Sequence, residues 1–150
     1  MVKSKIPKKE EFLIGVATIV LNSHGEILIG FDSNKQKWAF PGGHWEGEQN
    51  GETLREAALR ETFEETGGNY GKGIKCIIIN QIYEHVFFRE DKQCWYKSIG
   101  FLADYLSGEL ADDPDEQRTN WKFMRPQDIE KLDLFQPAKY GLTEYLKTLK

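Results

Sequence analysis

The stretch that decides the fold is PGGHWEGEQNGETLREAALRETFEETGG, residues 41–68. Its second half predicts a helix that begins at Leu54, because Thr53 followed three residues later by Glu56 is the pattern of a capping box. Gly67 and Gly68 tolerate left-handed dihedral angles and are expected to end this helix. Its first half, with two consecutive glycines, predicts a tight turn followed by a loop.

The predicted helix carries a cluster of carboxylates. It advances about 100° per residue, so Glu61, Glu64 and Glu65 project from one face within about one turn. Such a cluster suits a hard divalent cation, and magnesium leaves positions open for the oxygens of a polyphosphate substrate. Arg60 lies four residues after Glu56 and four before Glu64, so we expect it to fix a glutamate rotamer. The alternative is an ordinary solvated acidic face.

Apolar segments on both sides of this stretch predict a sheet and two further helices. The composition of these segments indicates strands at 12–21, 26–31, 38–40, 74–83, 94–106 and 121–124. A short helix is expected at 126–132, and Pro137 opens a last helix whose apolar face is Ala138, Leu142, Tyr145, Leu146 and Leu149. The order of elements predicts the α/β class, with a mixed β-sheet sandwiched between helices.

Length and composition limit the remaining possibilities. A chain of 150 residues is expected to form one domain, and a net charge of −4 argues against a protein that mainly coats nucleic acid. The locally basic residues 1–10 predict a flexible tail. Cys76 and Cys94 lack the spacing of a zinc or redox motif and are expected to be buried thiols. With no apolar run near the roughly 20 residues that span a bilayer, and no signal-peptide pattern, we expect a cytoplasmic protein without a membrane partner.

The central stretch resembles the signature of the Nudix hydrolases, the MutT family. Glu52, seven further residues and the run RETFEETG at 60–67 match that signature, and WAFPGGH at 38–44 resembles its lead-in. The resemblance places a single Nudix domain at 11–150, with the signature at 42–68 and an α/β/α sandwich as its fold. Eight residues rather than five separate Gly43 from Glu52, and we assign the additional residues to the loop at 47–50.

The resemblance also implies an activity and a set of site residues. Members hydrolyse a nucleoside diphosphate linked to another group, by attack of water on phosphorus with Mg²⁺ or Mn²⁺. The implied metal ligands are Glu61, Glu64, Glu65 and the carbonyl of Gly43. Arg60 belongs to the catalytic set, and the general base is Glu61 or the loop acid Glu116.

The loop at 112–121 bears on the substrate. Asp115 and Glu116 shortly before Trp121 resemble an acidic segment of members that hydrolyse nucleoside triphosphates, including oxidised nucleotides. These acids could equally belong to a solvated loop, with Trp121 in the core. Phe31 is one of several aromatic residues that could contact a base.

The nucleoside triphosphate hypothesis leads, with dinucleoside polyphosphate or nucleotide-sugar hydrolysis as alternatives. A non-catalytic nucleotide sensor is the alternative from another functional class. Only the lysine-rich tail suggests RNA as a partner, so RNA is not expected; the chain is expected to be a monomer or a homodimer.

Overall fold

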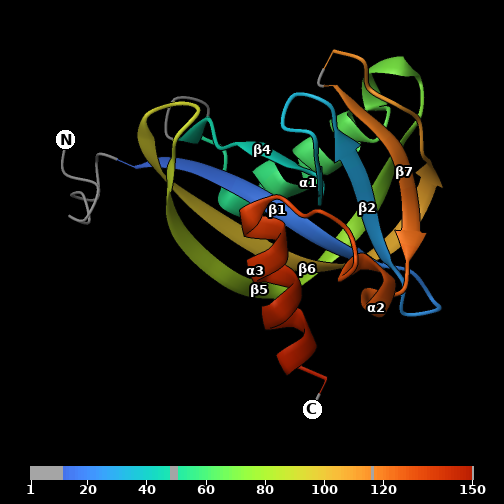
Figure 1. Cartoon of the computed structure of the whole chain (residues 1–150). Coiled ribbons are helices and arrows are strands. Elements are labelled where there is room, and N and C mark those ends of the chain that lie inside the picture. Colours follow the sequence, from blue (N-terminus) through green and yellow to red (C-terminus); the bar gives the residue numbers. More distant parts are fainter. Residues whose placement is uncertain (1–11, 48–50, 116, 150) are drawn as a thin grey trace.

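A mixed seven-stranded sheet forms the middle of the molecule in the computed structural model, which describes residues 12–47, 51–115 and 117–149 (Figure 1). The central strands lie in the order β3-β2-β1-β6-β5, while β4 pairs with β1 and β7 pairs with β2. The strands are β1 (Leu13–Leu21), β2 (Ile27–Asp32), β3 (Lys37–Ala39), β4 (Gly42–His44), β5 (Gly73–Arg89), β6 (Cys94–Glu109) and β7 (Arg118–Met124).

The register of the sheet follows from one parallel pairing and several hairpins. β1 runs parallel to β6, with Leu13 opposite Tyr96. The pairs β1–β2, β1–β4, β2–β3, β2–β7 and β5–β6 are antiparallel. Parallel neighbours need a crossover, and the segment that contains α1 (Leu54–Glu65) and β5 supplies it. The predicted mixed sheet is thereby confirmed.

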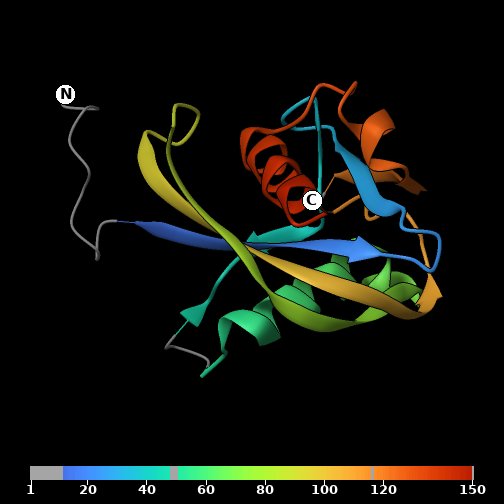
Figure 2. The same cartoon turned by 90° about the horizontal axis from the view of Figure 1, so that it is seen from below.

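Helices cover both faces of the sheet. Seen from below, α1 lies on one side of the layer formed by β1, β6 and β5, and α3 (Gln136–Lys147) lies on the other (Figure 2). α1 begins at the predicted residue, with both hydrogen bonds of the capping box present between Thr53 and Glu56. Its buried side includes Ala57 and Ala58, whose small side chains allow close approach to the sheet.

Two short helical elements complete the chain: η3 (Gly68–Tyr70) follows α1, and α2 (Pro126–Ile129) precedes α3. Cys76 is buried and Cys94 half-buried, and both are free thiols. Within the described residues, no helix is long and apolar enough to span a bilayer.

Several details differ from the sequence-based expectations: the helix expected at 126–132 ends at Ile129, and β5 and β6 run beyond the ends expected for them. Gly42 and Gly43 form strand β4 rather than a turn, and a side chain at Gly42 would overlap the carbonyl oxygen of Val16 on β1. β7 begins at Arg118 rather than at residue 121, so part of the expected loop is strand. Leu149 lies beyond the end of α3 and is 61% exposed. The predicted basic tail at 1–10 lies outside the described residues.

Candidate active site

The carboxylates of α1 lie against the two glycines of β4. The backbone N–H of Gly42 donates to Oε1 of Glu65 at 2.6 Å. A methyl group added at Gly43 would overlap the carboxylate of Glu61, so this carboxylate sits directly over the glycine backbone. Gly43 is therefore needed because helix and strand approach too closely there for a side chain, a requirement distinct from the turn that the sequence suggests.

Arg60 connects three of the glutamates. Its Nε and Nη2 donate to the two oxygens of Glu52 at 2.6 and 3.1 Å, in the bidentate geometry typical of strong arginine–carboxylate pairs. Its Nη1 donates to Glu61 at 2.8 Å and to Glu64 at 3.1 Å. The hydrogen bond to Glu52, with the negative charge of Glu61, raises the pKa of Arg60. The predicted pairing with Glu64 is present, whereas Glu56 is used by the helix cap instead.

The donor set suits a hard divalent cation. Glu61 and Glu64 both approach one nitrogen of Arg60, so oxygens of these two carboxylates lie around a common point of positive charge. Carboxylate and backbone carbonyl oxygens are the ligands that Mg²⁺ and Mn²⁺ prefer. In the described parts of the chain, no three potential ligands already converge on one point. A metal bound here would therefore need these side chains to turn towards it, among them Glu65, whose carboxylate accepts a hydrogen bond from Gly42.

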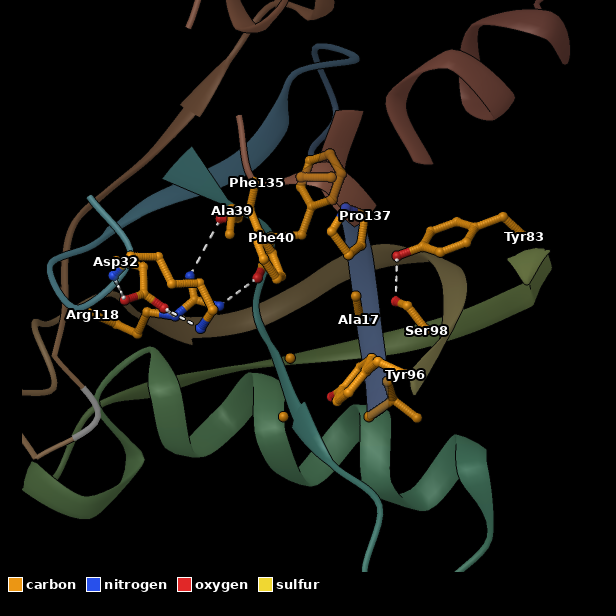
Figure 3. Close-up of a pocket in the computed structure, with 15 residues that line it drawn as sticks. Ala17, Asp32, Ala39, Phe40, Tyr83, Tyr96, Ser98, Arg118, Phe135 and Pro137 are labelled. Atoms are coloured by element: carbon orange, nitrogen blue, oxygen red, sulfur yellow. Dashed lines mark hydrogen bonds and ion pairs between the residues drawn. The ribbon is translucent and has the colours of Figure 1, made fainter. Parts of the chain in front are cut away.

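A buried arginine of β7, Arg118, contacts Glu65 and the segment that leads into β4. Arg118 donates from Nη2 to the carbonyl of Phe40 at 2.8 Å, and its Nε lies 3.5 Å from Oε2 of Glu65 and 3.6 Å from Oδ2 of Asp32. Figure 3 shows this arginine between Asp32 and the chain that leads into β4. It thereby connects the end of β2, the approach to β4 and the end of α1.

A cavity of about 80 Å³ lies between these elements. Arg118, Asp32, Gly43 and Tyr96 form part of its lining. Burial, reinforced by the charges of Glu61 and Glu65 and opposed by Arg89, raises the pKa of Tyr96 to about 12. Its hydroxyl is therefore protonated at neutral pH and can donate a hydrogen bond.

An open groove of about 870 Å³ adjoins the cavity, because Lys35 and Phe135 line both. Five basic residues line the groove, against two acidic ones, although the chain as a whole carries a charge of −4. The basic residues are Lys35, Lys37, Arg89, Lys92 and Lys139. Positive charge gathered in one concave surface of an acidic protein attracts anionic ligands.

The residues proposed for substrate binding lie elsewhere. Trp121 is buried in the core, where its Nε1 donates to the carbonyl of Glu65 at 2.9 Å and its ring fills the space beside Gly30. Phe31 packs edge-on against Trp38, with ring centroids 5.3 Å apart, and does not line the cavity or the groove.

The two acids of the 112–121 loop that were expected to contact the substrate are Asp115 and Glu116. Asp115 accepts a hydrogen bond from the hydroxyl of Tyr70 at 2.6 Å and lines neither the cavity nor the groove. Glu116 lies outside the described residues. The placement of Phe31, Asp115 and Trp121 thus gives no support to the contacts expected from the sequence, because packing and local hydrogen bonds occupy these side chains.

Sequence reasoning missed Arg118, Asp32 and the basic lining of the groove. Arg118 contacts residues that are 78 and 79 positions away along the chain, so no local pattern could have revealed its role. The groove residues come from the β2–β3 loop, the β5–β6 hairpin and the start of α3, and only the fold brings them together. Asp32, as an acid that ends an apolar strand, was the one available signal.

The buried carboxylate of Asp32 makes the stability depend on pH. Burial alone would raise its pKa, but hydrogen bonds from the backbone and ammonium of Lys35, with the charge of Arg118, lower it below the ordinary value of 3.8. Ionised Asp32 therefore stabilises the fold above its unfolded pKa, and this contribution is lost as the pH falls through the folded pKa.

We expect Asp32→Asn to lower the free energy of unfolding by about 2 kcal/mol at pH 7 and by progressively less towards pH 3. Urea unfolding at a series of pH values measures the difference from the wild type. Asp133→Asn, in an exposed pair with Lys37, is the control and should cost less than about 1 kcal/mol. A difference that stays constant down to pH 3 would contradict the expectation.

Comparison with known proteins agrees with this arrangement. The profile of the NUDIX domain matches residues 11–146. The chain is 33% identical over 85 residues to a Bacillus subtilis (strain 168) protein that carries the unverified name 8-oxo-dGTP diphosphatase, covering 57% of this chain and 52% of that protein. It is 43% identical over 56 residues to an RNA pyrophosphohydrolase of Roseobacter denitrificans, covering 36% of this chain and 33% of the relative. The chain thus matches only about half or less of these curated relatives.

Solved structures show the same fold over nearly the whole chain. The MutT protein from Methanosarcina mazei Go1 has a TM-score of 0.76 at 19% identity, covering 96% of this chain and 99% of that one. The NUDIX domain of Shewanella oneidensis NrtR, solved with ADP ribose, has a TM-score of 0.72 at 17% identity, covering 99% and 97%. A glutamate-bearing helix against a double-glycine strand, and a family profile that covers most of the sequence, lead to one assignment: the chain belongs to the Nudix family.

Proposed function

We propose that this enzyme hydrolyses nucleoside triphosphates, oxidised or non-canonical ones included, to a nucleoside monophosphate and pyrophosphate. One observation carries the proposal: Glu61 and Glu65 lie against Gly43 and Gly42, which line a cavity that shares Lys35 and Phe135 with a basic groove. Carboxylates that can hold a cation, beside lysines that can receive phosphates, form a site for a metal-dependent reaction of a polyphosphate.

Glu61, Glu64, Glu65 and the carbonyl of Gly43 would hold Mg²⁺, and Mn²⁺ can replace it. When bound, such an ion supplies Lewis-acid polarisation of phosphoryl oxygens and makes a coordinated water more acidic. Arg60 keeps Glu61 and Glu64 side by side through hydrogen bonds of 2.8 and 3.1 Å. Its role is to orient these carboxylates rather than to contact the substrate.

Other side chains of the site would transfer the proton and bind the phosphates and the nucleoside. Glu61 accepts a proton from the attacking water, whose oxygen forms a bond to phosphorus while the bridging P–O bond breaks and pyrophosphate leaves. Glu116 is the alternative base from the sequence. Lys35 and Arg89 both line the groove and neutralise the phosphates. Their charged groups lie 5.0 and 5.7 Å from the ring centre of Phe135, which provides an apolar surface for the nucleoside.

Hydrolysis of dinucleoside polyphosphates is the second candidate. The groove, at about 870 Å³, lies near the upper end of the roughly 300–1,000 Å³ usual for small-molecule sites, and five basic residues line it. It therefore has room and charge for a second nucleoside joined through a polyphosphate chain. Such a substrate would use the same carboxylates but yield two nucleotides.

A substrate panel with product identification tests the proposal. Purified protein with Mg²⁺ would be given nucleoside triphosphates, dinucleoside polyphosphates, nucleotide sugars and a short 5′-triphosphorylated RNA, the last because of the similarity to an RNA pyrophosphohydrolase. We expect inorganic pyrophosphate and a nucleoside monophosphate as products. Paired nucleotides would indicate a dinucleotide substrate, and a sugar phosphate a nucleotide sugar. Tight nucleotide binding without turnover in saturating Mg²⁺ would refute catalysis in favour of a sensor.

A further inference from the structure

Arg118 is a buried cation whose guanidinium contacts three separate segments. Its relative exposure is 6%, and both flanking carboxylates, those of Asp32 and Glu65, are also buried. Burying a charge is costly unless partners compensate for it, and the contacts of Arg118 supply such partners. The contacts here include two carbonyls, of Ala39 and Phe40, just before the double glycine of β4.

The contacts of Arg118 and Trp121 meet at one residue of α1. Nε of Arg118 lies 3.5 Å from Oε2 of Glu65, while Nε1 of Trp121 donates to the backbone carbonyl of the same glutamate at 2.9 Å. The guanidinium carbon of Arg118 also lies 5.3 Å from the centre of the Trp121 ring. β7 thus holds both the side chain and the backbone of Glu65.

We propose that Arg118 is a positioning residue for divalent-cation binding: it sets the Glu65 carboxylate and the segment that leads to Gly43 in the arrangement the ion requires. The inference rests on the metal-binding role of Glu65 in the proposed function. A residue that orients a metal ligand through charge and hydrogen bonds typically changes metal affinity when it is replaced. Arginine suits the task because its planar fork serves carbonyls and carboxylates at once, which the single ammonium of lysine cannot do.

The geometry favours a positioning role over a purely structural one. A cation needed only for packing could pair with Asp32 alone, which also accepts hydrogen bonds from the backbone N–H groups of Asn34 and Lys35. Arg118 instead lies about equally far from Asp32 and from Glu65, and its shorter hydrogen bond goes to Phe40. Its contacts therefore join the two parts of the proposed metal site, the end of α1 and the approach to β4.

The test measures Mn²⁺ binding by electron paramagnetic resonance in the absence of nucleotide. We expect Arg118→Met to weaken Mn²⁺ binding about 10- to 100-fold per folded molecule, and Arg118→Lys to weaken it at least about threefold. Arg125→Met is the matched control, because Arg125 is 63% exposed and pairs with Asp128 outside the site; its Mn²⁺ affinity should equal that of the wild type. Circular dichroism and thermal unfolding give the folded fraction of each variant.

The Mn²⁺ affinities of the variants distinguish a positioning role of Arg118 from a structural one. Mn²⁺ affinity within twofold of the wild type in folded Arg118→Met, even with a lower Tm, would make Arg118 merely structural and overturn the inference. Should Arg118→Met not fold, unchanged affinity in Arg118→Lys overturns it in the same way. A wild type that binds no Mn²⁺ also overturns it. If the affinity order holds but no nucleotide is hydrolysed, the proposed function fails and the positioning role stands.

Discussion

Glu64→Gln is expected to lower kcat for nucleoside triphosphate hydrolysis about 100- to 1,000-fold while the protein remains folded. The substitution removes a negative charge from the cluster that is proposed to hold the metal, yet keeps nearly the same size and shape. The Glu64 side chain is 33% exposed and accepts a hydrogen bond from Arg60 at 3.1 Å, so little packing is lost. Initial rates at saturating substrate and Mg²⁺ measure the effect.

Glu56→Gln is the matched control for this experiment. It makes the same chemical change on the same helix, but Glu56 serves the capping box, and a glutamine oxygen can still accept the hydrogen bond from Thr53. We expect kcat within about twofold of the wild type. If Glu64→Gln also keeps kcat within threefold, the carboxylate cluster is not the reaction centre and the proposed mechanism is wrong.

Gly43→Ala is expected to lower kcat/KM about 100-fold with little loss of stability. The new methyl group would overlap the carboxylate of Glu61, which is the far end of a flexible side chain and can rotate away. The fold then persists, but the proposed base and metal ligand is displaced, and a displacement of about 1 Å costs on the order of 100-fold in rate. Steady-state kinetics and urea unfolding on the same preparation measure both quantities.

Gly42→Ala provides the contrast. Its methyl group would overlap the backbone carbonyl of Val16, which cannot move without disturbing the pairing of β1 with β4. We expect this variant to lose about 1–3 kcal/mol of unfolding free energy, the usual cost of overpacking. Full activity in Gly43→Ala would show that Glu61 does not need its position over the glycine. Equal losses of stability in the two variants would show that the Glu61 carboxylate does not rotate away from the new methyl group.

Local sequence patterns predicted helices and strands correctly where a short segment by itself determines the secondary structure. The capping box placed the start of α1 at Leu54, and hydrophobic composition located the main strands and α3. Boundaries failed where long-range pairing extends an element: β5 continues to Arg89 and β6 to Glu109 because each strand satisfies the other's hydrogen bonds. Leu149 fits the helical spacing of α3, yet the helix ends at Lys147.

The sequence by itself determined the chemistry of α1, because residues three and four apart on a helix share a face whatever the rest of the chain does. It also determined that glycines precede this helix, though not that they form a strand. Only the tertiary structure decided what surrounds the carboxylates: Arg118 and Tyr96 reach the cavity from β7 and β6, and the basic groove joins three distant segments. The position of Trp121 was likewise decided only by the tertiary structure. Its aromatic ring suits a base or a core equally well, and the packing of β7 against α1 places it in the core.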